Sequence, residues 1–244
     1  MRVVSLVPSL TEAVAATAPG LLVGATDWCS RPAGLDVVRV GGTKNPDVAA
    51  VAALRPDLVV ANEEENREPD LAALRAAGIE VMVTEVRGLD QALSELERVL
   101  VDGCGLARPR WLDEARRVWS SVEPVAGARA VVPIWRRPWM VLGRDTFAGD
   151  LLARLGVANV YAGHADRYPR IPLDELRGSG ADLVVLPDEP YAFGPDDGPE
   201  AFPSLPAALV DGRSLTWYGP SLVDAPGVLS AALRAALRAA HPGR

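Results

Sequence analysis

Two stretches, LRPDLVVANEE (Leu54–Glu64) and GSGADLVVLPDEP (Gly178–Pro190), resemble each other and predict the fold of the chain. In both, an aspartate precedes a short apolar run, and acidic residues follow it. Asp57 and Asp182 align, and about half of the 244-residue chain separates them. Apolar runs without polar alternation are typical of parallel strands that helices cover on both faces. The duplication therefore predicts two similar α/β lobes.

The same kind of run recurs along the chain and alternates with helical patterns. SLTEAVAATA opens with a capping box in which Ser9 and Glu12 satisfy each other's backbone amides. DTFAGDLLARLG is expected to begin at Asp145 as its cap and to stop at Gly156. The predicted strands are Val3–Val7, Leu21–Ala25, Asp57–Ala61, Glu80–Val86, Ala130–Trp135, Val157–Tyr161, Asp182–Pro187 and Ser214–Tyr218.

The segment between the two lobes is predicted to be helical. LDQALSELERVL and PRWLDEARRVWSSVE both have helical periodicity, and DGCG interrupts them. An apolar face on such a segment indicates a stiff spine instead of a flexible linker. We therefore expect an N-terminal lobe over 1–88, a helical connector over 89–123 and a C-terminal lobe over 124–244.

Composition excludes several classes of function. The net charge of −7 and the pI of about 5.0 argue against nucleic acid, which rewards clustered cations. No apolar run approaches the ~18 residues of a membrane span, and the strand-like start after Met1 does not read as a signal peptide. As written, the chain is expected to be cytoplasmic, with export if the N-terminus is truncated. Cys29 and Cys104 are expected to be buried thiols, with a disulfide as the alternative.

Aromatic side chains gather after the predicted strands, where open parallel sheets bind ligands. PIWRRPWMVLGRD (Pro133–Asp145) places two tryptophans and two arginines after one strand, although aromatic residues make up 5% of the chain. A core would exclude the charge and a solvated loop would not need the rings, so we expect the rim of a binding cleft. Rings follow other strands in the same way at Trp28, Tyr191, Phe193, Trp217 and Tyr218.

Longer segments carry a family resemblance. In the first half they are RVVSLVPSLTE (2–12), GATDWCSRP (24–32) and GGTKNPDVAAVAALRPDLVVANEEENRE (41–68). In the second half they are PIWRRPWMVLGRDTFAGDLLARLG (133–156) and LPDEPYAFG (186–194). These segments resemble the cobalamin-type periplasmic binding proteins. This family belongs to the helical-backbone metal receptors, the substrate-binding components of ABC importers for corrinoids, haem and ferric siderophores.

The resemblance implies an α/β fold of two Rossmann-like lobes with central parallel sheets, joined by a helical backbone, with a ligand cleft between them. The helical connector indicates a self-sufficient monomer. The resemblance implies a binding protein that needs no cofactor and catalyses no reaction, with cobalamin as the first ligand and haem or a ferric siderophore as others. It also implies acidic residues that dock to the transporter permease. Glu63, Glu64, Glu65 and Glu189 are candidates for that role.

A flat metal chelate has apolar faces and polar edges, so rings suit its faces and polar groups suit its edges. The expected face contacts are Trp28, Trp135, Trp139, Tyr191 and Trp217. The expected edge contacts are Ser9, Lys44, Asn45, Arg136 and Arg137, and no residue is assigned to a metal.

Two other functions stay open on the sequence alone. One is an enzyme that acts on a corrinoid-like substrate, although the chain has no P-loop, GxSxG, HExxH or GxGxxG after its first strand. The other is a cytoplasmic sensor or partner-binding module on the same fold. His164 and His241 are the only histidines, and His164 is expected to lie in a surface loop.

Overall fold

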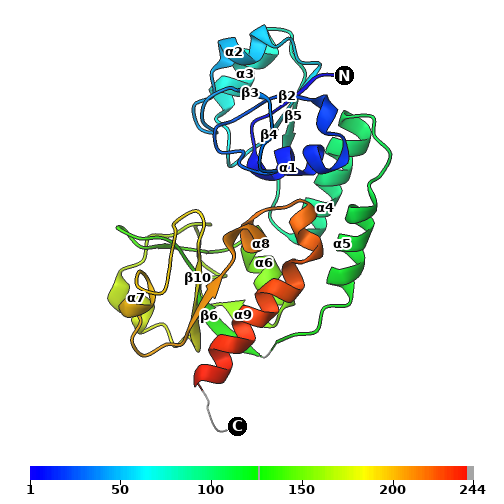
Figure 1. The fold of residues 1–244 in the computed structure, drawn as a ribbon. Helices are drawn as coiled ribbons and strands as arrows, with labels where there is room; N and C mark the ends of the chain where they lie inside the picture. Colours follow the sequence, from blue (N-terminus) through cyan, green and yellow to red (C-terminus); the bar gives the residue numbers. More distant parts are fainter. Residues whose placement is uncertain (126, 241–244) are drawn as a thin grey trace. The chain divides into compact units, whose positions relative to one another are not determined.

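The computed structural model describes residues 1–125 and 127–240, and these form two compact units (Figure 1). The first unit comprises Met1–Val86, Asp90–Arg116 and Tyr218–Pro220. The second comprises Arg87–Leu89, Arg117–Trp217 and the described residues from Ser221 onward. The division into 1–88, 89–123 and 124–244 as independently folding parts stays a prediction.

The first unit is built on a parallel sheet with the strand order β3-β2-β1-β4-β5. Its core consists of apolar side chains from these strands and from the helices that cover them, among them Val4, Leu6, Val59 and Leu71, all of which are buried. The strands are β1 (Val3–Ser5), β2 (Leu22–Ala25), β3 (Val38–Arg39), β4 (Leu58–Asn62) and β5 (Val81–Thr84).

The second unit repeats this arrangement in a parallel sheet with the order β11-β10-β6-β9. β1 lies between β2 and β4 in the first sheet, and β6 lies between β9 and β10 in the second, so β6, β9, β10 and β11 correspond to β1, β2, β4 and β5. A separate antiparallel hairpin, β7 with β8, follows β6. The strands are β6 (Ala128–Val131), β7 (Pro133–Trp135), β8 (Met140–Val141), β9 (Val157–Asn159), β10 (Leu183–Pro187) and β11 (Ala207–Val210).

Asp57 and Asp182 make the same contacts in the two units. The Asp57 carboxylate accepts the Arg2 amide at 2.6 Å, and the Asp57 amide donates to the Arg2 carbonyl at 2.8 Å. Asp182 does the same with Arg129, at 2.7 Å and 2.8 Å. The aspartates therefore tie the start of β4 to the start of β1 and the start of β10 to the start of β6. The predicted duplication is confirmed, and so is the α/β fold with two parallel sheets.

Helices cover the sheets and connect their strands. In the first unit α4 is followed by a π-helical segment, Arg98–Gly103, and in the second unit α9 packs against β11. The α-helices are α1 (Pro8–Thr17), α2 (Val48–Ala53), α3 (Glu68–Ala76), α4 (Leu89–Glu97), α5 (Arg110–Ser120), α6 (Phe147–Arg154), α7 (Leu173–Arg177), α8 (Gly212–Thr216) and α9 (Ala225–Ala240). The 3₁₀ turns are Pro19–Leu21, Pro199–Ala201 and Pro220–Val223.

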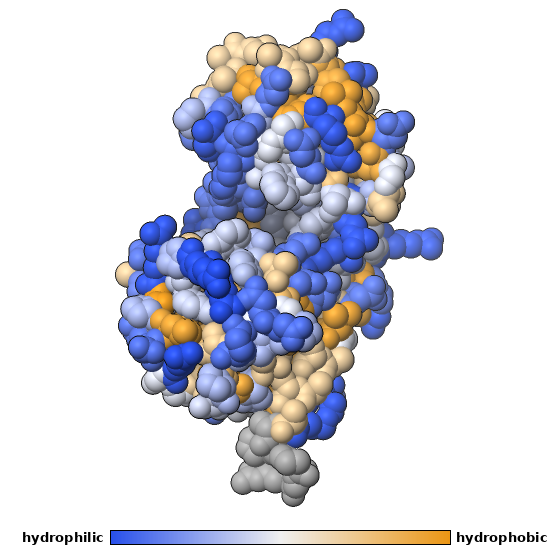
Figure 2. All heavy atoms as spheres, turned by 60° about the vertical axis from the view of Figure 1, so that its left-hand side comes forward, coloured by the Kyte–Doolittle hydropathy of each residue, from blue (hydrophilic) through white to orange (hydrophobic). Residues whose placement is uncertain are grey.

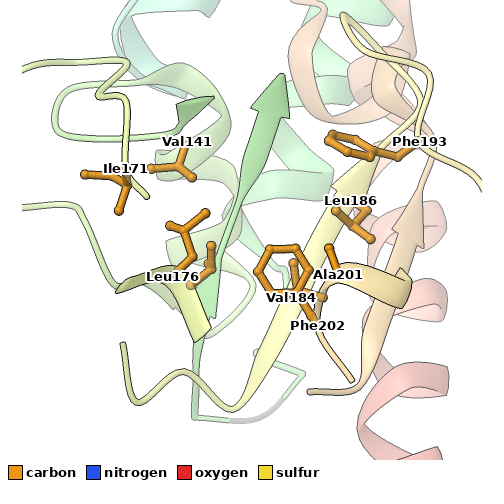
Figure 3. Packing of buried hydrophobic residues seen from close by; sticks show 9 residues of the cluster. Val141, Ile171, Leu176, Val184, Leu186, Phe193, Ala201 and Phe202 are labelled. Atoms are coloured by element: carbon orange, nitrogen blue, oxygen red, sulfur yellow. The ribbon is translucent and has the colours of Figure 1, made fainter. Parts of the chain in front are cut away.

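The core of the second unit lies on one side of β6 and β10 (Figure 3). There Val184 and Leu186 of β10 pack with Val141, Leu176 and Phe202, and all five are buried. Phe193 and Phe202 come from the segment after β10, which therefore belongs to the core as well as to the surface.

Three local predictions were wrong. Ser214–Tyr218 is not a strand, because the Asp211 carboxylate accepts the Ser214 amide at 2.7 Å and caps α8. The capping box at Ser9 does not form, since Pro8 occupies the first turn and Val7 is the N-cap. The N-cap of α6 is Thr146 instead of Asp145, which has a φ of +49°.

Candidate functional site

The candidate residues of the first unit follow the carboxyl ends of its parallel strands. Ser9 follows β1, Trp28 follows β2, Lys44 and Asn45 follow β3, and the acidic run 63–65 follows β4. Because parallel strands end at one edge of the sheet, these loops share that edge. Ser9 is buried, because it lies within α1 and only 5% of its surface is accessible.

Trp28 is presented to solvent at this edge with 69% of its surface exposed. Its indole lies beside the glycine turn that follows β3. A Cβ on Gly42 would lie 3.5 Å from the indole nitrogen of Trp28 and 2.5 Å from Oδ1 of Asn45. The indole would be in ordinary contact with such a Cβ, whereas the Asn45 amide would have to shift, so both side chains lie over Gly42.

Lys44 is tied to the turn after β4. Its ammonium group donates to the carbonyl oxygen of Glu64. Burial raises the pKa of Glu65, and the charge of Lys44 opposes that rise. The lysine is therefore held by a backbone carbonyl of its own unit, and its charge acts on Glu65.

Two buried asparagines, which the sequence analysis did not single out, shape this edge. The Asn66 amide group donates to the carbonyls of Leu6, at 3.2 Å, and Thr43, at 2.9 Å. The Asn62 carbonyl oxygen accepts the amides of Glu64 and Glu65, at 2.9 and 3.3 Å. The loops after β1, β3 and β4 are thus joined by side-chain amides. The only sign of them in the sequence is that the run NEEEN begins and ends with asparagine.

In the second unit, Trp135 and Tyr191 come together. Trp135 ends β7 with 43% of its surface exposed, and half-buried Tyr191 lies in the segment after β10. Their ring centroids are 5.6 Å apart with an interplanar angle of 79°. Together the two rings offer an edge-to-face aromatic pair at the carboxyl side of this sheet.

The other two predicted tryptophans are more deeply placed. Trp139 is half-buried, stacks on Phe193 at 6.0 Å and meets Phe202 edge-on at 5.4 Å. Trp217 has 8% of its surface exposed and donates its indole N–H to the Glu189 carboxylate at 2.8 Å. The four tryptophans expected at the ligand faces therefore divide into two exposed ones, Trp28 and Trp135, and two that pack into the second unit, Trp139 and Trp217.

The adjacent arginines also differ. Arg136 forms ion pairs with Asp197 and with Glu200, the latter at 2.5 Å, and its guanidinium lies 5.3 Å from the centre of the Trp139 ring. Arg137 is exposed and has a φ of +67°, a left-handed conformation that is uncommon for a non-glycine residue.

Within residues 1–125 and 127–240, no group of three or more His, Cys, Asp or Glu side chains is arranged to hold a metal ion. His164 accepts the Asp166 amide on Nδ1 at 2.9 Å, and His241 lies outside the described residues. Cys29 and Cys104 are free and buried, as expected, and burial raises both thiol pKa values, that of Cys104 to about 11.

The surface of the described residues exposes few large apolar side chains. On the face shown in Figure 2, hydrophilic residues cover most of the second unit, and apolar residues form separate patches. Trp28 and Trp135 are the only tryptophans among the exposed large hydrophobic residues of this part of the chain. No helix in it is long and apolar enough to cross a bilayer.

Comparison with known sequences finds relatives along most of the chain. A vitamin B12-binding protein of Yersinia pestis is 32% identical over 192 residues, which cover 76% of this chain and 69% of the relative. The vitamin B12-binding protein of Vibrio cholerae is 24% identical over 204 residues, covering 79% of this chain and 72% of the relative. A scan against protein-family models finds no match.

Solved structures show the same fold. The periplasmic vitamin B12-binding protein of Vibrio cholerae matches with a TM-score of 0.78 and 21% identity, over 96% of this chain and 97% of that one. A periplasmic heme-binding protein from Pseudomonas aeruginosa matches with a TM-score of 0.74 and 26% identity, over 96% and 92%.

Proposed function

This chain belongs to the family of the vitamin B12-binding proteins, and we propose that it binds a metal chelate as the substrate-binding protein of an ABC-type importer. Cobalamin is the first candidate ligand, since the relatives are named for vitamin B12. The observation that carries the proposal is the exposure of one indole at the carboxyl edge of each parallel sheet, Trp28 in the first unit and Trp135 in the second. An exposed indole at the edge where parallel sheets bind ligands offers a flat apolar face that a chelate can cover.

We assign the faces of the chelate to Trp28, Trp135 and Tyr191, and its polar edges to Lys44, Asn45 and Arg137. A fully buried aromatic ring covers ~150–250 Å², which at ~25 cal/mol/Å² gives an upper limit of ~4–6 kcal/mol. Three rings that are about half covered contribute ~6–9 kcal/mol, which offsets much of the ~4–15 kcal/mol cost of association, so the polar edge contacts supply the rest of a micromolar affinity. Trp139, Trp217 and Ser9 are at most peripheral contacts, because all three are largely engaged inside their units.

The proposal includes a transporter as partner. Glu63, Glu64, Glu65 and Glu189 lie in loops at the carboxyl edges of the two sheets, and we propose that the accessible ones among them meet cationic residues of a permease. The solved relatives are periplasmic proteins, so they do not support the expected cytoplasmic location. We propose that this chain too acts outside the cytoplasmic membrane.

Haem is the second candidate ligand, because several solved structures of this fold are heme-binding proteins. An enzyme or a sensor module on the same fold is the weaker alternative. The relatives are binding proteins, and the rings and amides at the two sheet edges are suited to holding a ligand, not to proton transfer or nucleophilic attack.

A competition experiment tests the proposal. The purified chain is titrated with cyanocobalamin, dicyanocobinamide, haemin and a ferric siderophore while tryptophan fluorescence is followed. We expect saturable quenching by the corrinoids at or below micromolar concentration, with haemin weaker. Tighter binding of haemin would transfer the proposal to the second ligand, and the absence of binding by every chelate would refute it. Chemical change of a bound chelate would instead support the enzyme.

A further inference from the structure

The aromatic side chains of the second unit form a continuous row from the surface to the core. Trp135 meets Tyr191 at 5.6 Å, Tyr191 meets Phe193 at 4.6 Å, and Phe193 stacks on Trp139 at 6.0 Å. The row ends at buried Phe202, which Trp139 meets at 5.4 Å. Figure 3 shows Phe193 and Phe202 at the core end, beside Leu186 and Val184. We refer to these five rings as the aromatic row.

One arginine connects the two segments that supply this row. Trp135 and Trp139 come from the β7–β8 hairpin, whereas Tyr191, Phe193 and Phe202 come from the segment after β10. Arg136, in the hairpin, pairs with Asp197 and with Glu200, both in the second segment. Only 17% of its side chain is exposed, and the guanidinium lies over the Trp139 ring at 5.3 Å. A forked guanidinium can hold two carboxylates at once, which an ammonium group cannot do in the same geometry.

Asp197 uses its second oxygen to hold a ring of the row. The Tyr191 hydroxyl donates to Oδ2 of Asp197 at 2.6 Å, while Oδ1 faces Arg136. The Asp197 backbone is itself fixed by a pair of hydrogen bonds with Gly194, at 3.0 and 3.2 Å. Glu200 is fixed in a similar way, since its Oε2 accepts the Gly198 amide at 2.5 Å. Both acidic residues are therefore held by local hydrogen bonds in addition to their contacts with the arginine.

We propose that Arg136, Asp197 and Glu200 form a positioning lock, which fixes Tyr191 and Trp135 in the geometry that receives the ligand without touching the ligand itself. The proposal rests on the proposed function of the chain. It reassigns Arg136, which the sequence analysis expected to contact the edge of the chelate. The guanidinium already has two carboxylate partners and a ring beneath it and is only 17% exposed, so its charge is balanced within its own unit and attracts an anionic ligand edge only weakly.

The substitution Asp197→Asn distinguishes a positioning role from direct contact, because the two predict opposite signs. If Arg136 touched an anionic edge of the ligand, loss of the competing carboxylate would leave affinity unchanged or raise it. If the lock positions the rings, the same substitution weakens the hydrogen bond that holds Tyr191. The affinity for cyanocobalamin then falls by about three- to tenfold, the size expected for one partly exposed charged hydrogen bond. Asp174→Asn, which breaks an ion pair with Arg177 at 3.4 Å on α7, is the matched control.

A double-mutant cycle gives the second readout. Arg136→Gln is expected to weaken binding about as much as Asp197→Asn, and the double variant is expected to be no more than about twofold weaker than either, since both remove one lock. Tyr191→Phe keeps the ring, removes only the hydroxyl, and serves if either charge variant folds poorly. Near-ultraviolet circular dichroism of the ligand-free protein should lose aromatic intensity in Asp197→Asn and not in Asp174→Asn.

The outcomes separate the lock from the proposed function. If the wild type binds cyanocobalamin and Asp197→Asn binds it equally well or more tightly, the lock is overturned but the proposed function is not. Full additivity of the two substitutions in the double-mutant cycle has the same consequence. If the wild type binds none of the chelates, the proposed function fails. The lock is then decided by circular dichroism, where an unchanged aromatic band in Asp197→Asn overturns it.

Discussion

Replacing Trp28 by alanine is expected to remove ligand affinity and to leave folding nearly intact. The tryptophan offers ~200 Å² of surface, and 69% of it is exposed, which leaves ~140 Å² for a ligand to cover. Covering half to all of this area is worth ~2–3.5 kcal/mol at ~25 cal/mol/Å². At about 1.4 kcal/mol for each factor of ten, Trp28→Ala should weaken binding roughly 30- to 300-fold.

The same residue type in the interior provides the contrast. Trp217 has 8% of its surface exposed and donates a hydrogen bond to Glu189. Trp217→Ala should therefore cost about 3–5 kcal/mol of unfolding free energy. For Trp28→Ala the change in unfolding free energy should stay within about 0.5 kcal/mol, as for most exposed positions.

Two assays on each variant check this pair of predictions. Isothermal titration calorimetry with cyanocobalamin gives the affinity, and urea denaturation gives the free energy of unfolding. The reasoning is refuted if Trp28→Ala binds within about threefold of the wild type, or if it destabilises the chain as much as Trp217→Ala does. Either result would mean that exposure at the sheet edge does not identify the ligand surface.

Three further predictions follow from single contacts. Gly42→Ala puts a methyl group 2.5 Å from Oδ1 of exposed Asn45, so it should turn that amide aside and change the free energy of unfolding in urea by no more than about 0.5 kcal/mol, and a larger loss would contradict this. Asp182→Ala removes the carboxylate that accepts the Arg129 amide and should cost about 1 kcal/mol in urea, with no change contradicting the role of the repeat. The hydrogen bond from Tyr191, with Arg136 nearby, holds the pKa of Asp197 below its usual 3.8, so its stabilisation is complete above that pH and is lost as the pH falls through the lower folded value. Asp197→Asn should accordingly flatten the acid end of a melting-temperature profile, and a parallel profile would contradict this.

Much of the fold could be predicted because the two halves of the sequence share a similar pattern. The aligned aspartates, Asp57 and Asp182, precede strands in the same position of each sheet and make the same backbone contacts. The errors arose where short patterns compete. The run 207–210 is alanine-rich and does not read as a strand, yet it pairs with β10, whereas the aromatic end of 214–218 reads as a strand although Asp211 caps a helix there.

The candidate site was less accessible to sequence reasoning. Position after a strand places Trp28 and Trp217 in the same class, but exposure depends on tertiary packing that local sequence does not encode. The pairing of Arg136 with Asp197 joins residues that are 61 positions apart, and two neighbouring arginines give no sign of which one is engaged. Asn62 and Asn66 were missed for the same reason, since Asn62 bonds to Thr84 on β5 and Asn66 bonds to the loops after β1 and β3.

Oxidative footprinting of the tryptophans with and without cyanocobalamin tests the central claim most directly. Hydroxyl-radical labelling followed by mass spectrometry reports the accessibility of each indole, and buried Trp119 and Trp217 serve as internal references. We predict that one bound cyanocobalamin per chain protects Trp28 and Trp135 together. Bound ligand with both indoles still oxidised at the rate of the free protein would contradict the account.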